Sequence, residues 1–306
     1  MLVRSAAIAA AGTAAPAQDG YAVEDPLPGY THSLTVRWCL TVVNRTDAVC
    51  RRPELKCLVP VRLTSTQLCR SVRASEPAEL LTDGWGNQAL ICRLADLPPY
   101  GRARVAFCAQ VDTSPAPLLT ADASTSAAFL QPSPGVESPV PEIAAAASAA
   151  LSPAGGGSPV DVLSAWVARS LRHDGYHAVD RGAAWALAHR RGDCSEFAAL
   201  LVALCRVRDI PARRMLGVAL PAAGGTLAAG TLHVWVETRE DDRWRPVDPL
   251  RQLDAAHRPV AFGILTRDAI AVTAFDSKLF RCEGKGVEVR LDGGSGQAAA
   301  SAGRRL

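Results

Sequence analysis

A single cysteine stands at the centre of the most informative segment of the chain, Arg191-Gly192-Asp193-Cys194-Ser195-Glu196-Phe197-Ala198. Apolar side chains follow it at three- and four-residue spacing as far as Cys205, which we expect in the core. The run stops before Ile210-Pro211, where a helix cannot continue. The pattern predicts a helix that begins at Cys194 and buries one face.

The start of a helix is a suitable place for a nucleophilic thiol. Unpaired backbone N–H groups and the helix dipole favour negative charge there, and so lower the pKa of a thiol. Gly192 allows a close approach to the backbone, and the N–H of Cys194 can stabilise an oxyanion. Cys194 is therefore a candidate nucleophile for acyl transfer.

A nucleophilic cysteine needs a base, and the base needs a partner that orients it. Two strands are predicted further along the chain, at 232–238 and 244–247, with His233 at the start of the first and Asp248 at the end of the second. Neighbouring antiparallel strands would bring these two side chains together. Taken singly, a buried cysteine, a structural histidine and an Asp-Pro turn are the commoner readings. Together and in this order, the three residues indicate a Cys-His-Asp triad.

Four short motifs around these three residues occur in the order that is typical of one protein family. Residues 191–198 are followed by Asp209-Ile210-Pro211-Ala212-Arg213, His233-Val234-Trp235-Val236-Glu237 and Trp244-Arg245-Pro246-Val247-Asp248-Pro249. Together they resemble the transglutaminase-like superfamily, which has a papain-like cysteine fold. The resemblance covers roughly residues 128 to 250, because Phe129-Leu130-Gln131-Pro132-Ser133 is similar to the family's lead-in segment. Asp209, Val234 and Leu250 depart from the residues that members commonly carry, and none of them removes a triad atom.

The resemblance implies roles for three residues. Cys194 would be the nucleophile, His233 the general acid and base, and Asp248 the residue that holds the imidazole. The second oxyanion donor is open, with Trp185 and Gln131 as the two candidates.

The N-terminal part of the chain shows the two-residue period of half-buried strands. Residues 33–43 and 102–111 alternate cleanly, and turn residues separate weaker strand signals between them. The proline in the short run 55–61 predicts an edge strand there. The pattern is typical of a β-sandwich and is similar to the N-terminal module that many bacterial members of the superfamily carry.

These signals divide the chain into five parts. We expect a disordered leader or weak signal at 1–27, a β-sandwich at 28–112, a linker and lead-in segment at 113–158 with a helix at 141–151, a transglutaminase-like catalytic domain at 159–291 and a disordered tail at 292–306. The predicted fold class is α+β: an N-terminal β-sandwich followed by a papain-like transglutaminase domain, with helices packed on an antiparallel sheet.

Charge, apolar stretches and cysteine spacing indicate which classes of partner and cofactor this chain is not expected to bind. The 306 residues carry a formal net charge of +3 without a run of basic residues longer than a pair, so nucleic acid is not expected. No stretch reaches the length of a membrane span, and no membrane partner is expected. The nine cysteines lack close C-x-x-C spacing, so we expect no metal and no cofactor. Reduced thiols in a cytoplasm are the favoured interpretation. The oligomeric state stays open.

The sequence thus predicts thiol-dependent acyl transfer or hydrolysis on a peptide, amide or thioester substrate, which a carrier could present. The superfamily includes crosslinkers, peptidases, peptide N-glycanases and amide synthases, so hydrolysis and amide synthesis both stay open. The alternative is a catalytically silent binding or scaffold protein whose β-sandwich recruits a partner. Outside the triad, His173 and His177 are expected to be solvated, and Arg213 and Glu237 to pair across strands.

Overall fold

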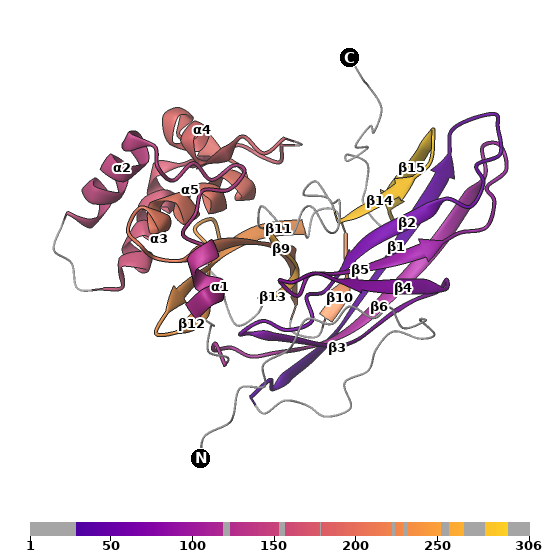
Figure 1. Ribbon diagram of the computed structural model, residues 1–306, viewed down its shortest axis with the longest axis horizontal. Coiled ribbons are helices and arrows are strands. Elements are labelled where there is room, and N and C mark those ends of the chain that lie inside the picture. The colour runs from indigo at the N-terminus through magenta and orange to yellow at the C-terminus, as the bar shows by residue number, and fades with distance from the viewer. Residues whose placement is uncertain are drawn as a thin grey trace.

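The computed structural model describes residues 29–118, 123–152, 157–177, 179–221, 224–228, 232–251, 257–265 and 279–292. The predicted leader lies outside these residues, as does the predicted tail apart from Asp292. Figure 1 shows a group of long strands on one side of the molecule and a cluster of helices on the other, with a further sheet between them. The fold is α+β with mostly antiparallel sheets, as predicted.

The long strands form a two-sheet sandwich. One sheet has the order β10-β1-β6-β3, with β15 also on β1, and the other has the order β14-β2-β5-β4. Trp38 of β1 is 2% exposed and stacks on Phe107 of β6 at 5.2 Å between ring centroids, so the predicted alternation places the core between the sheets. The strands are β1 (His32–Asn44), β2 (Glu54–Val59), β3 (Gln67–Ala74), β4 (Ala78–Thr82), β5 (Gln88–Arg93), β6 (Arg102–Thr113), β10 (Gly224–Thr226), β14 (Phe280–Glu283) and β15 (Val287–Leu291).

Both sheets recruit strands from the far end of the chain. β14 pairs with β2, and β15 pairs with β1. The sequence-based boundary assigned these strands to the catalytic domain at 159–291, whereas their backbone hydrogen bonds join them to the sandwich. β2 is consequently an interior strand, and the predicted edge position is wrong: Pro60 follows β2 and leaves its backbone donors free to pair.

The second unit packs helices against a four-stranded antiparallel sheet with the order β12-β11-β9-β13. Helix α5 is buried along almost its whole length, from Glu196 to Arg206, between this sheet and the other helices. The predicted helices at 141–151 and from Pro159 are confirmed as α2 and α3. The elements are α1 (Ala123–Ala128), α2 (Pro141–Leu151), α3 (Pro159–Ser170), β7 (Arg172–His173), α4 (Gly182–His189), β8 (Arg191–Gly192), α5 (Cys194–Arg206), β9 (Ala212–Pro221), β11 (Leu232–Glu240), β12 (Arg243–Val247) and β13 (His257–Leu265).

Strand β13 joins the two units. Its outer edge lies against two buried side-chain amides of the sandwich, and each amide pairs with both backbone groups of one residue. Gln67 accepts from the N–H of Ala261 at 2.7 Å and donates to its carbonyl at 3.0 Å. Asn87 does the same with Ile264, at 2.6 and 3.1 Å. The edge of the second sheet is therefore satisfied by amides that imitate a neighbouring strand.

Replacing one of these two side-chain amides tests how much the contact between the sandwich and β13 contributes to stability. In Gln67→Leu, the buried N–H of Ala261 loses its acceptor, whereas the Ala261 carbonyl keeps the backbone N–H of Val61 at 2.8 Å. We expect this change to lower the free energy of unfolding by about 1–3 kcal/mol. Urea unfolding measures the change. Gln110→Leu is the matched control, because Gln110 accepts one bond from Thr35 on the sandwich surface, and it should cost less than about 1 kcal/mol. Equal losses in the two variants would refute this role for Gln67.

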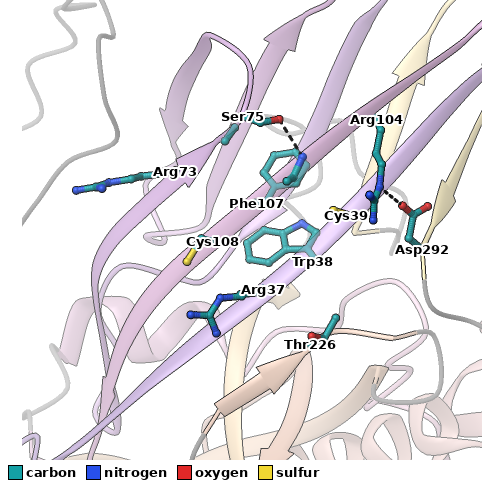
Figure 2. A pocket seen from close by; sticks show the side chains of 12 residues that line it. Arg37, Trp38, Cys39, Arg73, Ser75, Arg104, Phe107, Cys108, Thr226 and Asp292 are labelled. Carbon is teal, nitrogen blue, oxygen red and sulfur yellow. Dashed lines mark hydrogen bonds and ion pairs between the residues drawn. The ribbon is translucent and has the colours of Figure 1, made fainter.

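The outer face of the sandwich is hollowed. A cavity of about 580 Å³ lies over β1, β6 and β3, and Arg37, Arg73, Arg104, Cys39 and Cys108 are among the residues that line it (Figure 2). Arg104 is paired there with Asp292 at 2.7 Å. None of the three candidate catalytic residues lines this cavity.

In the part of the chain that the structure describes, no helix is long and apolar enough to cross a bilayer.

Candidate active site

Helix α5 begins at Cys194, as predicted, and a capping box fixes its first turn. The Asp193 carboxylate accepts the N–H of Ser195 at 2.8 Å, and the Glu196 carboxylate accepts the N–H of Asp193 at 2.9 Å. A side chain at Gly192 would put its Cβ 2.4 Å from that of Glu196. Glycine is therefore the residue that lets Glu196 fold back over the helix start.

The Cys194 thiol is half-buried at this first turn. Burial raises its pKa to about 11, and the nearby Asp193 carboxylate raises it further, whereas a hydrogen bond from the Val234 backbone N–H opposes the shift. The sequence predicted a lowered pKa from the helix start alone. Packing and the acidic N-cap, which the helix dipole does not offset, reverse that expectation, so the sulfur carries its proton at neutral pH.

His233 and Asp248 meet as the strand prediction required. His233 Nε2 lies 2.6 Å from Asp248 Oδ2, and the two side chains are 3% and 1% exposed. The other carboxylate oxygen accepts the backbone N–H groups of Leu250 at 2.9 Å and Arg251 at 3.0 Å. Because an ionised carboxylate only accepts, this contact favours the tautomer of the neutral imidazole that has its proton on Nε2 and its lone pair on Nδ1.

The three predicted residues come from the start of α5, the start of β11 and the position just after β12. β11 starts beside the end of β12, since Val236 pairs with Val247, and this register brings His233 to Asp248. Helix α5 packs on β11, and the Cys194 sulfur accepts the N–H of Val234, the residue that follows His233. Opposite His233 on β9 is Gly217, where a Cβ would lie 2.1 Å from the Val260 carbonyl, so the strands pack more closely here than other residues allow.

The two candidates for the second oxyanion donor make contacts elsewhere. Trp185 stacks on His189 at 4.2 Å, and the Arg181 guanidinium lies 3.9 Å from its ring centroid. The Gln131 side chain is exposed, and its backbone carbonyl accepts from Arg206. These contacts do not support either residue as a donor to the oxyanion.

Other predictions near the site can be compared with the structure. Cys205 is fully buried, as predicted, and Arg213 pairs with Glu237 across β9 and β11 at 2.6 Å. His173 is exposed, as predicted, and His177 is partly exposed, with 35% of its side chain accessible. The His177 ring also lies 2.9 Å from Asp174, and its backbone N–H donates to Asp193 at 2.8 Å. Single-residue reasoning missed these contacts because they depend on how Asp174 and His177 lie against Asp193 at the start of α5.

Comparison with known families agrees with this geometry. The pattern of the transglutaminase-like superfamily matches residues 144–249, a range that contains Cys194, His233 and Asp248. This segment is a transglutaminase-like domain. The match starts in α2 and ends one residue after Asp248, so the sandwich lies outside it.

Two solved structures are similar to this chain to different degrees. A proposed cysteine protease from Cytophaga hutchinsonii is 16% identical, with a TM-score of 0.58 over 90% of this chain and 93% of that one. The periplasmic domain of TgpA from Pseudomonas aeruginosa is 18% identical, with a TM-score of 0.37 over 76% and 85% of the two chains. No curated protein matches the chain. Because the first alignment covers 90% of this chain, the fold that the two proteins share includes both the sandwich and the second unit.

Proposed function

We propose that this protein is a thiol-dependent acyltransferase or hydrolase that acts on an amide or thioester carbonyl through an acyl-enzyme on Cys194. The observation that carries the proposal is the buried His233–Asp248 pair, 2.6 Å apart, with the Cys194 sulfur hydrogen-bonded to the residue next to that histidine. Thiophenol release from S-phenyl thioacetate, compared between the native protein and Cys194→Ala, tests it.

Each step of the reaction has a group to carry it. The Cys194 sulfur attacks the carbonyl carbon while His233 Nδ1 takes the thiol proton, and the carbonyl π electrons move to oxygen, where the Cys194 N–H stabilises them. Collapse reforms the C=O bond and breaks the bond to the amine or thiol, which leaves with the proton from the imidazolium. Water or an amine then attacks the thioester by the same steps, and the thiol regains its proton.

Asp248 contributes through the imidazole. Its carboxylate lies against Nε2 and is almost fully buried, so it stabilises the imidazolium that forms when Nδ1 takes the proton. Since Cys194 is a neutral thiol at rest, proton transfer has to accompany the attack, and the site depends on His233 as a general base rather than on a thiolate formed in advance.

The proposed substrate is a peptide, amide or thioester, with a carrier as one way to present it, and both water and an amine are possible acceptors. No cofactor is needed for these steps. We keep the cytoplasm as the proposed compartment, because nine free thiols would be prone to pair in an oxidising one.

The pH dependence of alkylation tests the electrostatics of the thiol. With a pKa of about 11, the reactive thiolate fraction of Cys194 grows about tenfold for each pH unit from 6 to 9. Iodoacetamide labelling followed by peptide mass analysis should therefore show a rate at Cys194 that rises over this whole range. An unstructured peptide with one cysteine and blocked ends is the control, and its rate begins to level off as the pH passes its ordinary thiol pKa of about 8.5. A plateau at Cys194 below pH 8 would show a preformed thiolate and contradict this account.

A further inference from the structure

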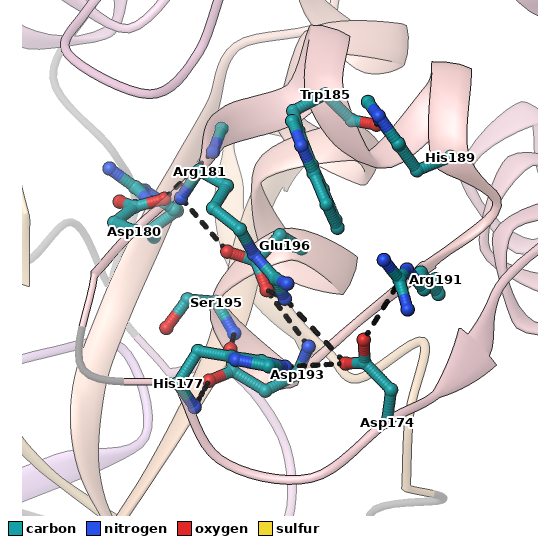
Figure 3. A network of polar contacts seen from close by, with 12 residues as sticks. Asp174, His177, Asp180, Arg181, Trp185, His189, Arg191, Asp193, Ser195 and Glu196 are labelled. Atoms are coloured by element: carbon teal, nitrogen blue, oxygen red, sulfur yellow. Dashed lines mark hydrogen bonds and ion pairs between the residues drawn. The ribbon is translucent and has the colours of Figure 1, made fainter.

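We infer that Arg181 and Glu196 are positioning residues for Cys194, because their buried ion pair ties the loop that precedes α4 to the first turn of α5. The inference rests on the proposed function. Figure 3 shows the pair at the centre of a network of polar contacts that reaches Asp193 and Asp174.

Glu196 is the hub of this network. Its side chain is fully buried, two residues after the nucleophile, and both of its oxygens are occupied. Oε1 accepts the backbone N–H of Arg181 at 3.0 Å, while Oε2 accepts Arg181 Nη2 at 2.8 Å and the N–H of Asp193 at 2.9 Å. These donors hold the pKa of Glu196 below its usual range, although burial acts in the opposite direction. The carboxylate thus accepts from three donors in fixed directions.

Asp193 transmits this constraint to the thiol. Its backbone N–H is held by Glu196, and its carboxylate oxygens accept the N–H groups of Ser195 and His177, each at 2.8 Å. Cys194 lies between two residues whose backbone N–H groups are both bound. The direction of its Cα–Cβ bond and of its own N–H therefore follows from the network.

Arg181 is itself held in place on two further sides. Its guanidinium lies over the Trp185 ring at 3.9 Å, and Nη2 lies 3.6 Å from Asp174 Oδ1. Asp174 also faces His177 at 2.9 Å and Arg191 at 3.7 Å. The loop that contains Asp174, His177 and Arg181 is in this way attached to the start of α5 by charge as well as by backbone contact.

The rest of α5 does not need this pair for its place in the fold. Its residues from Phe197 to Cys205 are buried in the apolar core, which fixes the helix as a body. The Arg181–Glu196 pair instead fixes the backbone of the first turn of α5. Glutamine at 196 would direct an amide NH₂ at the N–H of Arg181 or at that of Asp193, so the turn has to shift. A displacement of about 1 Å at a reacting atom can cost about 100-fold in rate.

The matched pair Glu196→Gln and Glu237→Gln separates positioning from stability. Glu237 is also buried and also pairs with an arginine of the same unit, Arg213 at 2.6 Å. We expect similar losses in the free energy of unfolding for the two variants. With S-phenyl thioacetate, Glu196→Gln should lower kcat by about 10- to 100-fold per folded molecule, with KM little changed, and Glu237→Gln should stay within about threefold of the native protein.

Arg181→Lys and Arg181→Met provide a second comparison if Glu196→Gln does not fold. Lysine keeps the charge beside Glu196 and should recover part of the kcat that methionine loses. Equal kcat ratios for Glu196→Gln and Glu237→Gln, or equal losses for the two Arg181 variants, would overturn the inference and leave the proposed function standing. Absence of any acylation of Cys194 in the native protein would overturn both.

Discussion

Replacing Cys194 by alanine is expected to abolish the release of thiophenol from S-phenyl thioacetate, a loss of about 1,000-fold or more. The thiol is the only protein group in the proposed reaction that forms a bond to the substrate carbon, and neither His233 nor Asp248 takes over that step. The measurement is the steady-state rate of thiophenol release at neutral pH. Cys194→Ala should fold normally, because its side chain is only half-buried.

Cys205→Ala is the matched control for this loss. Cys205 belongs to the same helix but is fully buried in the core. Its replacement should lower stability by about 1 kcal/mol and leave turnover per folded molecule unchanged. Undiminished turnover in Cys194→Ala would show that thiophenol release does not come from the proposed active site. The alternative of a catalytically silent scaffold would then be favoured.

Asp248→Asn should lower kcat by about 1,000- to 10,000-fold. One oxygen of Asp248 accepts His233 Nε2–H, and the other accepts the N–H groups of Leu250 and Arg251. An asparagine side chain has a single oxygen, so it can accept at only one of these two positions, the one that faces His233 or the one that faces Leu250 and Arg251. With the oxygen toward Leu250 and Arg251, its NH₂ donates to Nε2 and moves the ring proton to Nδ1, where the base is needed. With the oxygen toward His233, its NH₂ opposes two backbone donors.

Two further measurements distinguish this effect from a loss of folding: urea unfolding of Asp248→Asn, and the kinetics of the control variant Leu250→Ala. kcat for the thioester should fall while urea unfolding changes by less than about 2 kcal/mol, since two hydrogen bonds to backbone are partly kept. Leu250→Ala, which keeps the backbone N–H, should retain near-native kcat. A variant Asp248→Asn with native kcat would show that the carboxylate does not set the state of His233.

Most of the site follows from local patterns in the chain. The alternation at 33–43, the helix at Cys194 and the strands that carry His233 and Asp248 all depend on neighbours close in sequence, and the structure has each of them. The return of β14 and β15 to the sandwich could not be predicted in this way. Pairing between the two ends of a chain leaves no periodic signal in either end.

Two further features depend on packing that the sequence does not display. Gln67 and Asn87 look like ordinary polar residues of a sandwich, and only the tertiary fold brings them to the edge of β13. The raised pKa of Cys194 arises because burial and Asp193 act on the thiol together. A motif at a helix start reveals the dipole but not the burial.

Mass analysis of the acyl-enzyme tests the central claim most directly. The native protein is mixed with S-phenyl thioacetate, quenched in acid and digested, and the acetylated peptides are identified. The account predicts one rapidly formed acetyl group per chain, on Cys194, and none at that position in Asp248→Asn on the same timescale. An acetyl group that forms first on another cysteine, such as Cys39 or Cys108, or thiophenol release without acetylated Cys194, would contradict it.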